Sequence, residues 1–146
     1  MNFINKKYGD KMTIKVQPKN KNELIKIIED TIKKEGYDCN LNFIDTSCIK
    51  DMSYLFSGSK FNGDISGWDV SNAENMRGMF LDSKFNGDIS KWNIHDVFDM
   101  SFMFMNSKFS NNISKWNTRN VKLKLLCFEG CPLENNPEFQ PAFKIN

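Results

Sequence analysis

Apolar residues return at the same places with a fixed period between positions 52 and 123, as Met52, Met76 and Met100 show. Three consecutive units align without a gap, and each contains a version of the octapeptide S-K-F-N-G-D-I-S. The columns shared by all three units are Met52, Met76 and Met100; Phe56, Phe80 and Phe104; Phe61, Phe85 and Phe109; Ile65, Ile89 and Ile113; and Trp68, Trp92 and Trp116. A fixed period of this length is typical of proteins built from stacked repeats, in which neighbouring units bury one another's apolar faces.

Each unit contains two hydrophobic patterns, and they predict different elements. The spacing Ile65-x-x-Trp68-x-Val70 matches a leucine-rich-repeat strand whose apolar side chains point inward. The run that begins at Val97 places apolar residues at i, i+3, i+6 and i+7, which predicts a short helix. We therefore predict an α/β repeat fold: a right-handed, leucine-rich-repeat-like solenoid with a strand and a short helix in each 24-residue coil.

The pattern also predicts how the chain is organised. We expect residues 1–146 to form a single domain, with the repeat array at 41–123. Residues 1–40 precede the array and are expected to be an N-terminal cap. Residues 124–146, where the apolar columns decay, are expected to be a degenerate C-terminal cap.

The N-terminal cap is expected to consist of a strand and a helix. Residues 12–17 alternate like a strand. A helix is predicted to begin at Asn20, with Glu23 as its capping-box partner, and to end before Gly36. Its apolar stripe would lie across the open end of the first repeat and prevent edge-to-edge association.

Composition and charge exclude several classes of protein. The chain is 40% hydrophobic and 13% aromatic, which is too apolar for a disordered chain. A net charge of +2 argues against direct nucleic-acid binding. The sequence shows no transmembrane stretch and no apolar signal region, so we expect a cytoplasmic protein that does not bind a membrane.

The repeat resembles a known family. The pattern F-N-G-D-I-S-x-W, followed by M-x-x-M-F, is similar to the 24–26-residue repeats of BspA-like leucine-rich-repeat surface proteins, which also occur in mycoplasma surface lipoproteins. The leader P-K-N-K-N-E-L-I-K and the segment I-D-T-S-C-I-K-D-M-S-Y-L-F resemble the entry into such arrays, so the similarity covers roughly residues 15–123. The resemblance implies a right-handed solenoid that serves as a binding surface, often as an adhesin at the cell surface. It implies no catalytic residue.

The sequence offers little for enzyme chemistry. His95 is the sole histidine, and there is no Gly-rich phosphate loop, nucleophile elbow or paired metal-ligand motif. We expect a protein that is not an enzyme, with no catalytic residue, no cofactor and no bound metal.

Two short motifs have alternative interpretations. The N-G-D sequence at 62–64 could form a calcium turn, but it supplies a single carboxylate in each unit. We favour a tight turn in which Gly63 adopts a positive φ, with Asn111 at the same position in the third unit. Cys127 and Cys131 could bind zinc, but ordinary buried, reduced thiols are the preferred interpretation.

Residues that break the repeat pattern point to a binding surface. Apolar side chains stand where other units have polar or small ones, and Phe98, Phe102 and Met105 are spaced i, i+4, i+7. The predicted partner-binding residues are Phe98, Phe102, Met105, Leu81 and Tyr54. As an alternative, Phe139 and Phe143 of the C-terminal tail could fold back over this surface. A second candidate surface is polar and basic, and consists of Lys91, Asn93, Lys115, Asn117 and Arg119.

These features predict a non-enzymatic protein–protein interaction module that presents a rigid solenoid surface to a protein partner. Two alternatives stay open: a small phage-type inhibitor that blocks a bacterial defence nuclease, in the manner of an anti-CRISPR protein, and a fragment of a cell-surface adhesin. A homodimer is a further possibility, because exposed aromatic surfaces also form oligomer contacts.

Overall fold

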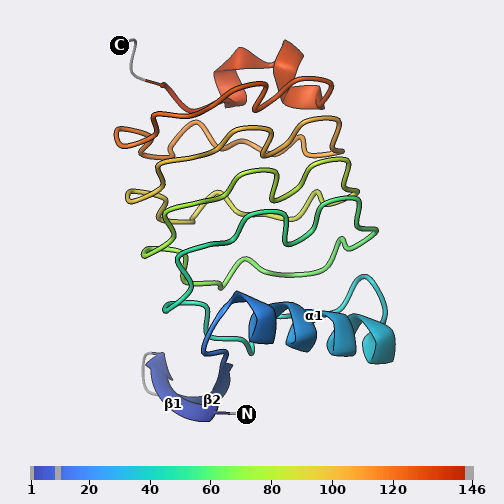
Figure 1. Cartoon of the computed structure of the whole chain (residues 1–146), viewed down its shortest axis with the longest axis vertical. Coiled ribbons are helices and arrows are strands. Elements are labelled where there is room, and N and C mark those ends of the chain that lie inside the picture. The colour runs from blue at the N-terminus through green and yellow to red at the C-terminus, as the bar shows by residue number, and fades with distance from the viewer. Residues whose placement is uncertain (1, 9–10, 144–146) are drawn as a thin grey trace.

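The chain winds into a stack of coils with the same period as the sequence repeat, as a computed structural model that describes residues 2–8 and 11–143 shows (Figure 1). Parallel backbone bridges join one coil to the next at equivalent positions. These bridges pair Asn40 with Asp64, Asp51 with Asn75, Asn75 with Asp99, and Asp99 with Leu123. The named elements are β1 (Asn2–Tyr8), β2 (Lys11–Gln17), α1 (Lys21–Glu35) and the 3-10 helices η1 (Pro132–Asn135) and η2 (Pro137–Phe139).

Helix α1 closes the N-terminal end of the stack (Figure 1). Its first turn is held by Asn20, whose Oδ1 accepts a hydrogen bond of 3.0 Å from the N–H of Glu23. Its last turn ends where Gly36, at φ 91°, donates its N–H to the carbonyl of Ile32. The predicted helix and both of its caps are confirmed. The buried face consists of Leu24, Ile27 and Ile28.

A hairpin precedes α1 and is attached to the first coil. β1 and β2 pair antiparallel, with Asn2 opposite Gln17 and Tyr8 opposite Lys11. β2 confirms the predicted strand, whereas β1 was not predicted from the sequence. β2 also enters the stack, because Val16 forms a parallel bridge with Ile44.

The segment predicted to be a short helix is a ladder of turns between coils. In residues 76–82, every second N–H donates to the next coil, as from Gly78 to the carbonyl of Ser101 at 2.9 Å. The N–H groups of Met79 and Leu81, in between, donate within their own coil, the latter to the carbonyl of Gly78 at 3.1 Å. We name residues 52–58, 76–82, 100–106 and 124–130 the turn ladder, and each of these segments a rung.

The predicted short helix is wrong for a physical reason. Gly78 and Asp82 have φ values of 57° and 55°, and a residue in this left-handed region cannot continue a right-handed α-helix. A short helix and this chain of turns share the same apolar spacing, because the inward positions of each rung also recur at i, i+3 and i+4.

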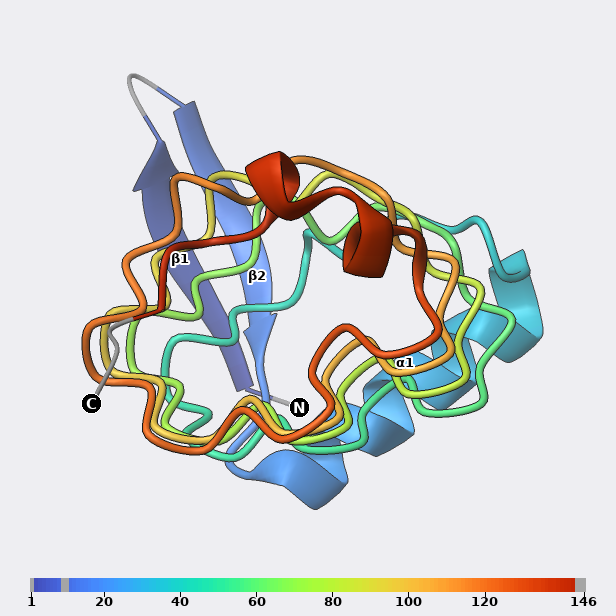
Figure 2. The same ribbon diagram turned by 90° about the horizontal axis from the view of Figure 1, so that it is seen from above.

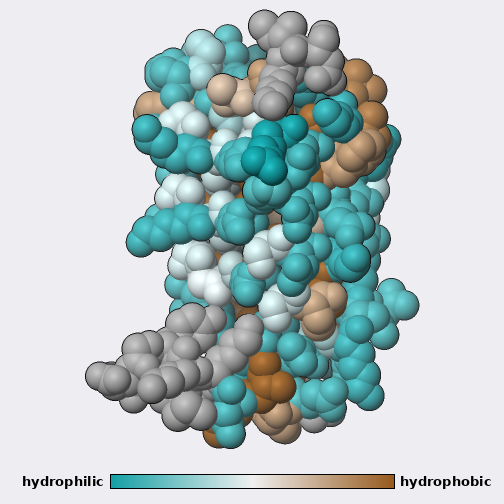
Figure 3. Space-filling view, turned by 90° about the vertical axis from the view of Figure 1, so that its left-hand side faces the viewer, coloured by the Kyte–Doolittle hydropathy of each residue, from teal (hydrophilic) through white to brown (hydrophobic). Residues whose placement is uncertain are grey.

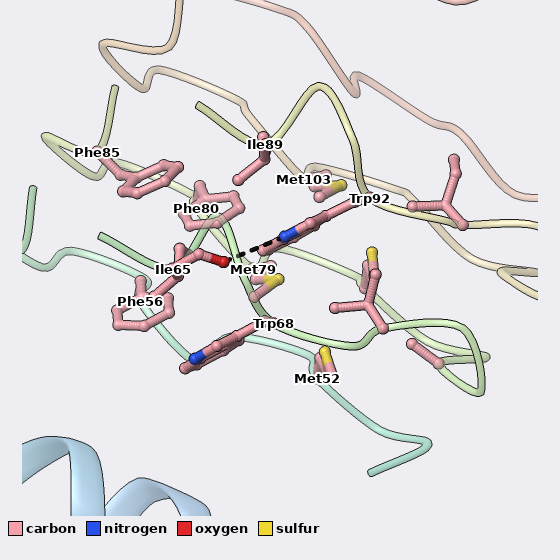
Figure 4. Packing of buried hydrophobic residues seen from close by; sticks show 14 of the residues in the cluster. Met52, Phe56, Ile65, Trp68, Met79, Phe80, Phe85, Ile89, Trp92 and Met103 are labelled. Atoms are coloured by element: carbon pink, nitrogen blue, oxygen red, sulfur yellow. Dashed lines mark hydrogen bonds between the residues drawn. The ribbon is translucent and has the colours of Figure 1, made fainter. Parts of the chain in front are cut away.

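The segment predicted to be a strand is likewise built from turns. Within 65–70 the described backbone contains no strand, and the N–H of Trp68 donates to the carbonyl of Ile65 at 3.1 Å. The inward direction of the apolar side chains is as expected, because Ile65, Trp68 and Val70 are buried. The indole Nε1–H of Trp92 joins the coils here by donating to the carbonyl of Ile65 at 3.2 Å (Figure 4).

The core consists of columns of identical side chains, each stacked on its copy one coil away (Figure 4). Ring centroids lie 5.7 Å apart for Phe56 and Phe80, and 5.5 Å apart for Phe80 and Phe104. The indole rings of Trp68 and Trp92 lie 6.5 Å apart and are nearly parallel. Each such contact adds about 0.5–1.5 kcal/mol to the burial of the rings themselves. Identical residues in successive coils therefore stabilise the stacking register.

The C-terminal segment lies across part of the opposite end of the stack (Figure 2). The carbonyl of Phe139 accepts a hydrogen bond of 2.9 Å from the N–H of Ile113, and that of Ala142 accepts one of 2.7 Å from Thr118 Oγ1. The ring of Phe143 packs against that of Phe128, with centroids 6.1 Å apart. The tail thus covers the end of the last coil.

Candidate partner-binding surface

Five side chains predicted to bind a partner lie on or beside the turn ladder. Phe98 and Tyr54 are exposed, with 49% and 47% of their surface accessible, and Phe102, Met105 and Leu81 are half-buried. Phe98 stands just before the third rung, where its carbonyl accepts a hydrogen bond from the N–H of Lys122 at 2.9 Å, and its N–H donates to the carbonyl of Glu74 at 2.8 Å. Backbone bonds to both neighbouring coils therefore hold the base of its side chain in place.

Arg77 joins Tyr54 to Phe102 across two coils. Its Nε donates a hydrogen bond of 3.0 Å to the Tyr54 hydroxyl, and its guanidinium carbon lies 4.6 Å from the centre of the Phe102 ring. An Arg77 guanidinium nitrogen lies 3.6 Å from a carboxylate oxygen of Asp99. The hydrogen bond to Tyr54, followed by the nearby Asp99 carboxylate, raises the pKa of Arg77 above its ordinary value. We name Tyr54, Arg77, Phe98 and Phe102 the aromatic surface.

Large side chains occupy a strained backbone position within this surface. Tyr54, Phe102 and Leu126 have φ values of 59°, 60° and 52°, and the fourth member of their column is Gly78 at 57°. A left-handed conformation costs a residue with a Cβ roughly 1–2 kcal/mol. Backbone strain that persists at bulky residues is often associated with function.

Gly78 makes room for the Tyr54 ring. A Cβ atom at position 78 would lie 2.4 Å from Tyr54 Cε1, which is closer than such atoms approach in proteins. The ring of Tyr54 can therefore lie over the Gly78 backbone and reach Arg77. In the sequence, Gly78 is the small residue one period before Phe102, and neither this role of Gly78 nor that of Arg77 was predicted.

Three exposed leucines near the C-terminal end were also missed. Leu123, Leu125 and Leu126 are exposed, and 61% of the Leu125 surface is accessible. They lie at or beyond the predicted end of the array at residue 123. The signal that could have found them is the period itself, because Leu125 and Leu126 come one full period after Ser101 and Phe102.

The C-terminal tail does not cover the aromatic surface as far as residue 143. Phe139 and Phe143 contact the end of the stack, at Ile113 and Phe128, while Phe98 keeps its exposure. The alternative in which the tail folds back over Phe98 and Phe102 is therefore wrong for the described residues.

The second candidate surface is exposed and polar. Its five side chains all face solvent: Lys91, Asn93, Lys115, Asn117 and Arg119. Asn117 Oδ1 accepts a hydrogen bond of 3.3 Å from the N–H of Arg119, so part of this polarity supports the local turn. One side of the stack, drawn in Figure 3, is mostly hydrophilic, with hydrophobic side chains at one edge near the C-terminal end and others near the N-terminal end.

The N-G-D motif has a structural role that differs from the expected one. Gly63 has no positive φ; instead, a Cβ there would lie 1.9 Å from the carbonyl oxygen of Cys39, so glycine permits close contact between coils. Asp64 Oδ1 accepts a hydrogen bond of 2.9 Å from the N–H of Ser66, and Asn112 does the same for Ser114. This bond lowers the pKa of Asp64 below its ordinary value.

Cys127 and Cys131 are free thiols, and both are buried. Burial raises the pKa of Cys127 far above its ordinary value, and burial likewise raises that of Cys131. Within the described part of the chain, no group of three or more His, Cys, Asp or Glu side chains could hold a metal ion. None of the described helices is both long enough and apolar enough to cross a membrane.

Residues 27–139 match the family model described as "Mycoplasma protein of unknown function, DUF285". The match covers most of the chain, including most of α1, all four rungs of the turn ladder and both 3-10 helices. No curated protein and no solved structure matches the chain.

Proposed function

The chain belongs to the mycoplasma protein family DUF285, and from this premise we propose that it is a non-enzymatic protein–protein interaction module. Its scaffold would be a capped solenoid of the BspA-like leucine-rich-repeat kind, in which the coils vary on the outside and stay constant inside. The parallel bridges between equivalent positions of successive coils support this proposal.

The observation that carries the function is the aromatic surface. Phe98 and Tyr54 are exposed, and Arg77 links Tyr54 to Phe102 through a hydrogen bond and a cation–π contact. Tyrosine and arginine are enriched among the residues that dominate binding energy at protein interfaces. A surface held by inter-coil backbone bonds is preformed, which lowers the entropic cost of binding.

A second candidate function is that of a cell-surface adhesin. The mycoplasma family match favours it, together with the similarity of the repeats to those of BspA-like surface proteins. The partner would then be a host protein, whereas an inhibitor of the phage type would bind a bacterial nuclease. A homodimer through the same aromatic surface is the third outcome, and an experiment must distinguish it from binding to a host protein or to a bacterial nuclease.

The test replaces residues of the aromatic surface with residues that the chain already uses in the same columns. Phe98→Glu copies Glu74 one coil below, and Phe102→Gly copies Gly78, so both variants should fold. Capture from host-cell extracts and from bacterial extracts identifies the partner, and titration of that purified partner measures affinity. We expect each variant to weaken binding at least about tenfold, equivalent to about 1.4 kcal/mol.

The matched control is Lys91→Glu, on the polar second surface, which should leave the affinity unchanged. If Lys91→Glu abolishes binding while Phe98→Glu and Phe102→Gly do not, the partner uses the polar surface and the assignment of the aromatic surface is wrong. Light scattering of the free chain distinguishes the homodimer, which Phe98→Glu should dissociate.

A further inference from the structure

The last rung of the turn ladder, residues 124–130, has backbone N–H groups on the side that faces away from the coil below. On the rung below, the N–H groups of Phe102 and Phe104 donate to the carbonyls of Leu125 and Cys127 at 2.8 and 2.9 Å. In the same register, the N–H groups of Leu126 and Phe128 face the position of a further coil. Neither donates a hydrogen bond to any acceptor in the described residues.

The two ends of the ladder are not equivalent. At the first rung, α1 lies across the stack, and Lys21 Nζ donates to Asp51 and to Ser53 Oγ at 3.0 and 2.6 Å (Figure 1). At the last rung, the tail bonds to Ile113 and Thr118, and its Phe143 ring contacts the side chains of Phe128 and Lys124. These tail contacts involve the side chains of the last rung, and they leave the N–H groups of Leu126 and Phe128 without an acceptor in the described residues.

The hydrogen-bonding polarity of this rung restricts what can bind it. The carbonyls of Leu125 and Cys127 already accept from the rung below, and that of Leu126 accepts from Glu129 within its own turn. The rung thus offers donors and needs acceptors. The same rung of a second copy would bring donors against donors, which excludes an end-to-end dimer through this surface.

One donor of this rung already has an acceptor from outside the repeat pattern. The N–H of Gly130, which corresponds to that of Asn106 one coil below, donates to Glu134 Oε2 at 2.9 Å. This contact demonstrates that an oxygen supplied by another segment can replace the carbonyl of a following coil.

From this geometry we propose that residues 124–130 bind an extended peptide segment of the partner protein as one further rung of the ladder. Backbone carbonyls of the segment accept from Leu126 and Phe128, and its apolar side chains cover Leu125 and Leu126, which are exposed. Unpaired edges of this kind bind extended chains through main-chain hydrogen bonds. This proposal rests on the proposed function. It adds a second contact area, residues 124–130, to which the partner supplies backbone carbonyls and apolar side chains.

The chain itself supplies the probe. Residues 75–82, N-M-R-G-M-F-L-D, occupy this position on the first rung, where their carbonyls accept from Met52, Tyr54, Phe56 and Gly58 at 2.7–3.0 Å. A synthetic peptide of this sequence is titrated into the full chain, and amide hydrogen exchange is followed residue by residue by NMR. A peptide of the same composition in scrambled order is the control.

In the free chain we expect the amides of Leu126 and Phe128 to exchange much faster than those of Phe102 and Phe104. At saturation with the peptide, their exchange should slow at least about tenfold. Leu125→Asp should weaken peptide binding at least about tenfold, about 1.4 kcal/mol, and Lys91→Glu, on the polar second surface, should leave it unchanged.

Full protection of Leu126 and Phe128 in the free chain would overturn the proposal, as would peptide binding that leaves these amides unprotected or equal binding of the scrambled peptide. Failure of the peptide to bind at millimolar concentration would also overturn it. These failures are distinct from failure of the proposed function, because loss of the purified partner on Phe98→Glu does not depend on this rung.

Discussion

The aspartates of the repeated octapeptide each hold a turn through one carboxylate oxygen. Asp64 and Asp88 accept hydrogen bonds of 2.9 Å from the N–H groups of Ser66 and Ser90, and these bonds lower the pKa of both carboxyls. A carboxyl whose pKa is lower in the folded chain adds stability above its unfolded pKa of about 3.9 and loses it as the pH falls through the folded value. Part of the acid sensitivity of folding therefore resides in these two residues.

The double variant Asp64→Asn, Asp88→Asn tests this assignment. Asn112 already makes the same hydrogen bond in the third unit, so the turns should persist without a titrating group. Near neutral pH we expect a loss of at most about 1 kcal/mol, because solvent screens exposed carboxylates. Below about pH 4 the free energy of unfolding should fall less steeply in the variant than in the parent chain. Urea unfolding followed by circular dichroism over this range measures both slopes, and equal slopes would show that the titrating groups lie elsewhere.

At the scale of elements, α1 depends on its first turn. Asn20 Oδ1 satisfies the N–H of Glu23, which has no partner inside the helix. We expect Asn20→Ala to lower the free energy of unfolding by about 1 kcal/mol. Asn20→Asp is the matched control, since it keeps the acceptor and adds a favourable charge at the helix N-terminus. Denaturant unfolding of the parent chain and of both variants measures the free energy of unfolding. A similar decrease in Asn20→Ala and Asn20→Asp would show that the effect does not come from the cap.

Elements defined by local chemistry could be predicted from the sequence, and those defined by contacts between coils could not. The bounds of α1 follow from Asn20 and Gly36, whose effects act within a few residues. The rungs were predicted to be helical because inward positions at i, i+3 and i+4 are common to a helix and to a chain of turns. A chain of turns differs from a helix in that alternate N–H groups donate to the neighbouring coil. That coil is distant in sequence, so a local pattern does not predict these hydrogen bonds. β1 could have been found, since Gly9-Asp10 between two segments is a hairpin signal.

The same distinction applies to the candidate surface. Phe98 and Tyr54 could be identified because they break a column, and both are exposed. Arg77 could not, since its importance comes from reaching a hydroxyl in the coil before it and a ring in the coil after it. The N–H groups of Leu126 and Phe128 have no acceptor within the described part of the chain because of where the tail lies. The decayed apolar pattern after residue 123 does not specify that position.

At the scale of the whole molecule, each coil is stabilised mainly by its neighbours, so position in the stack should determine what a core substitution does. Stability in stacked repeats is approximately a sum of terms for each unit and for each interface between units. Phe80 packs against Phe56 and Phe104, and therefore contributes to two interfaces between coils. Phe128 stacks on Phe104 and is covered on its other side by Phe143 of the tail.

We therefore expect Phe80→Ala to lower the free energy of unfolding by about 3–5 kcal/mol, the range for a buried phenylalanine that leaves a cavity. Phe128→Ala, at the same column position, should have roughly half that effect, because it removes one interface between coils and the tail can move into the space. Denaturant unfolding measures the difference, and hydrogen exchange locates it. Exchange should increase throughout the stack for Phe80→Ala, but mainly at 124–143 for Phe128→Ala. Equal destabilisation by both, or faster exchange in α1 for Phe128→Ala, would mean that the stack unfolds as one indivisible unit and that its end has no independent freedom to receive a further rung.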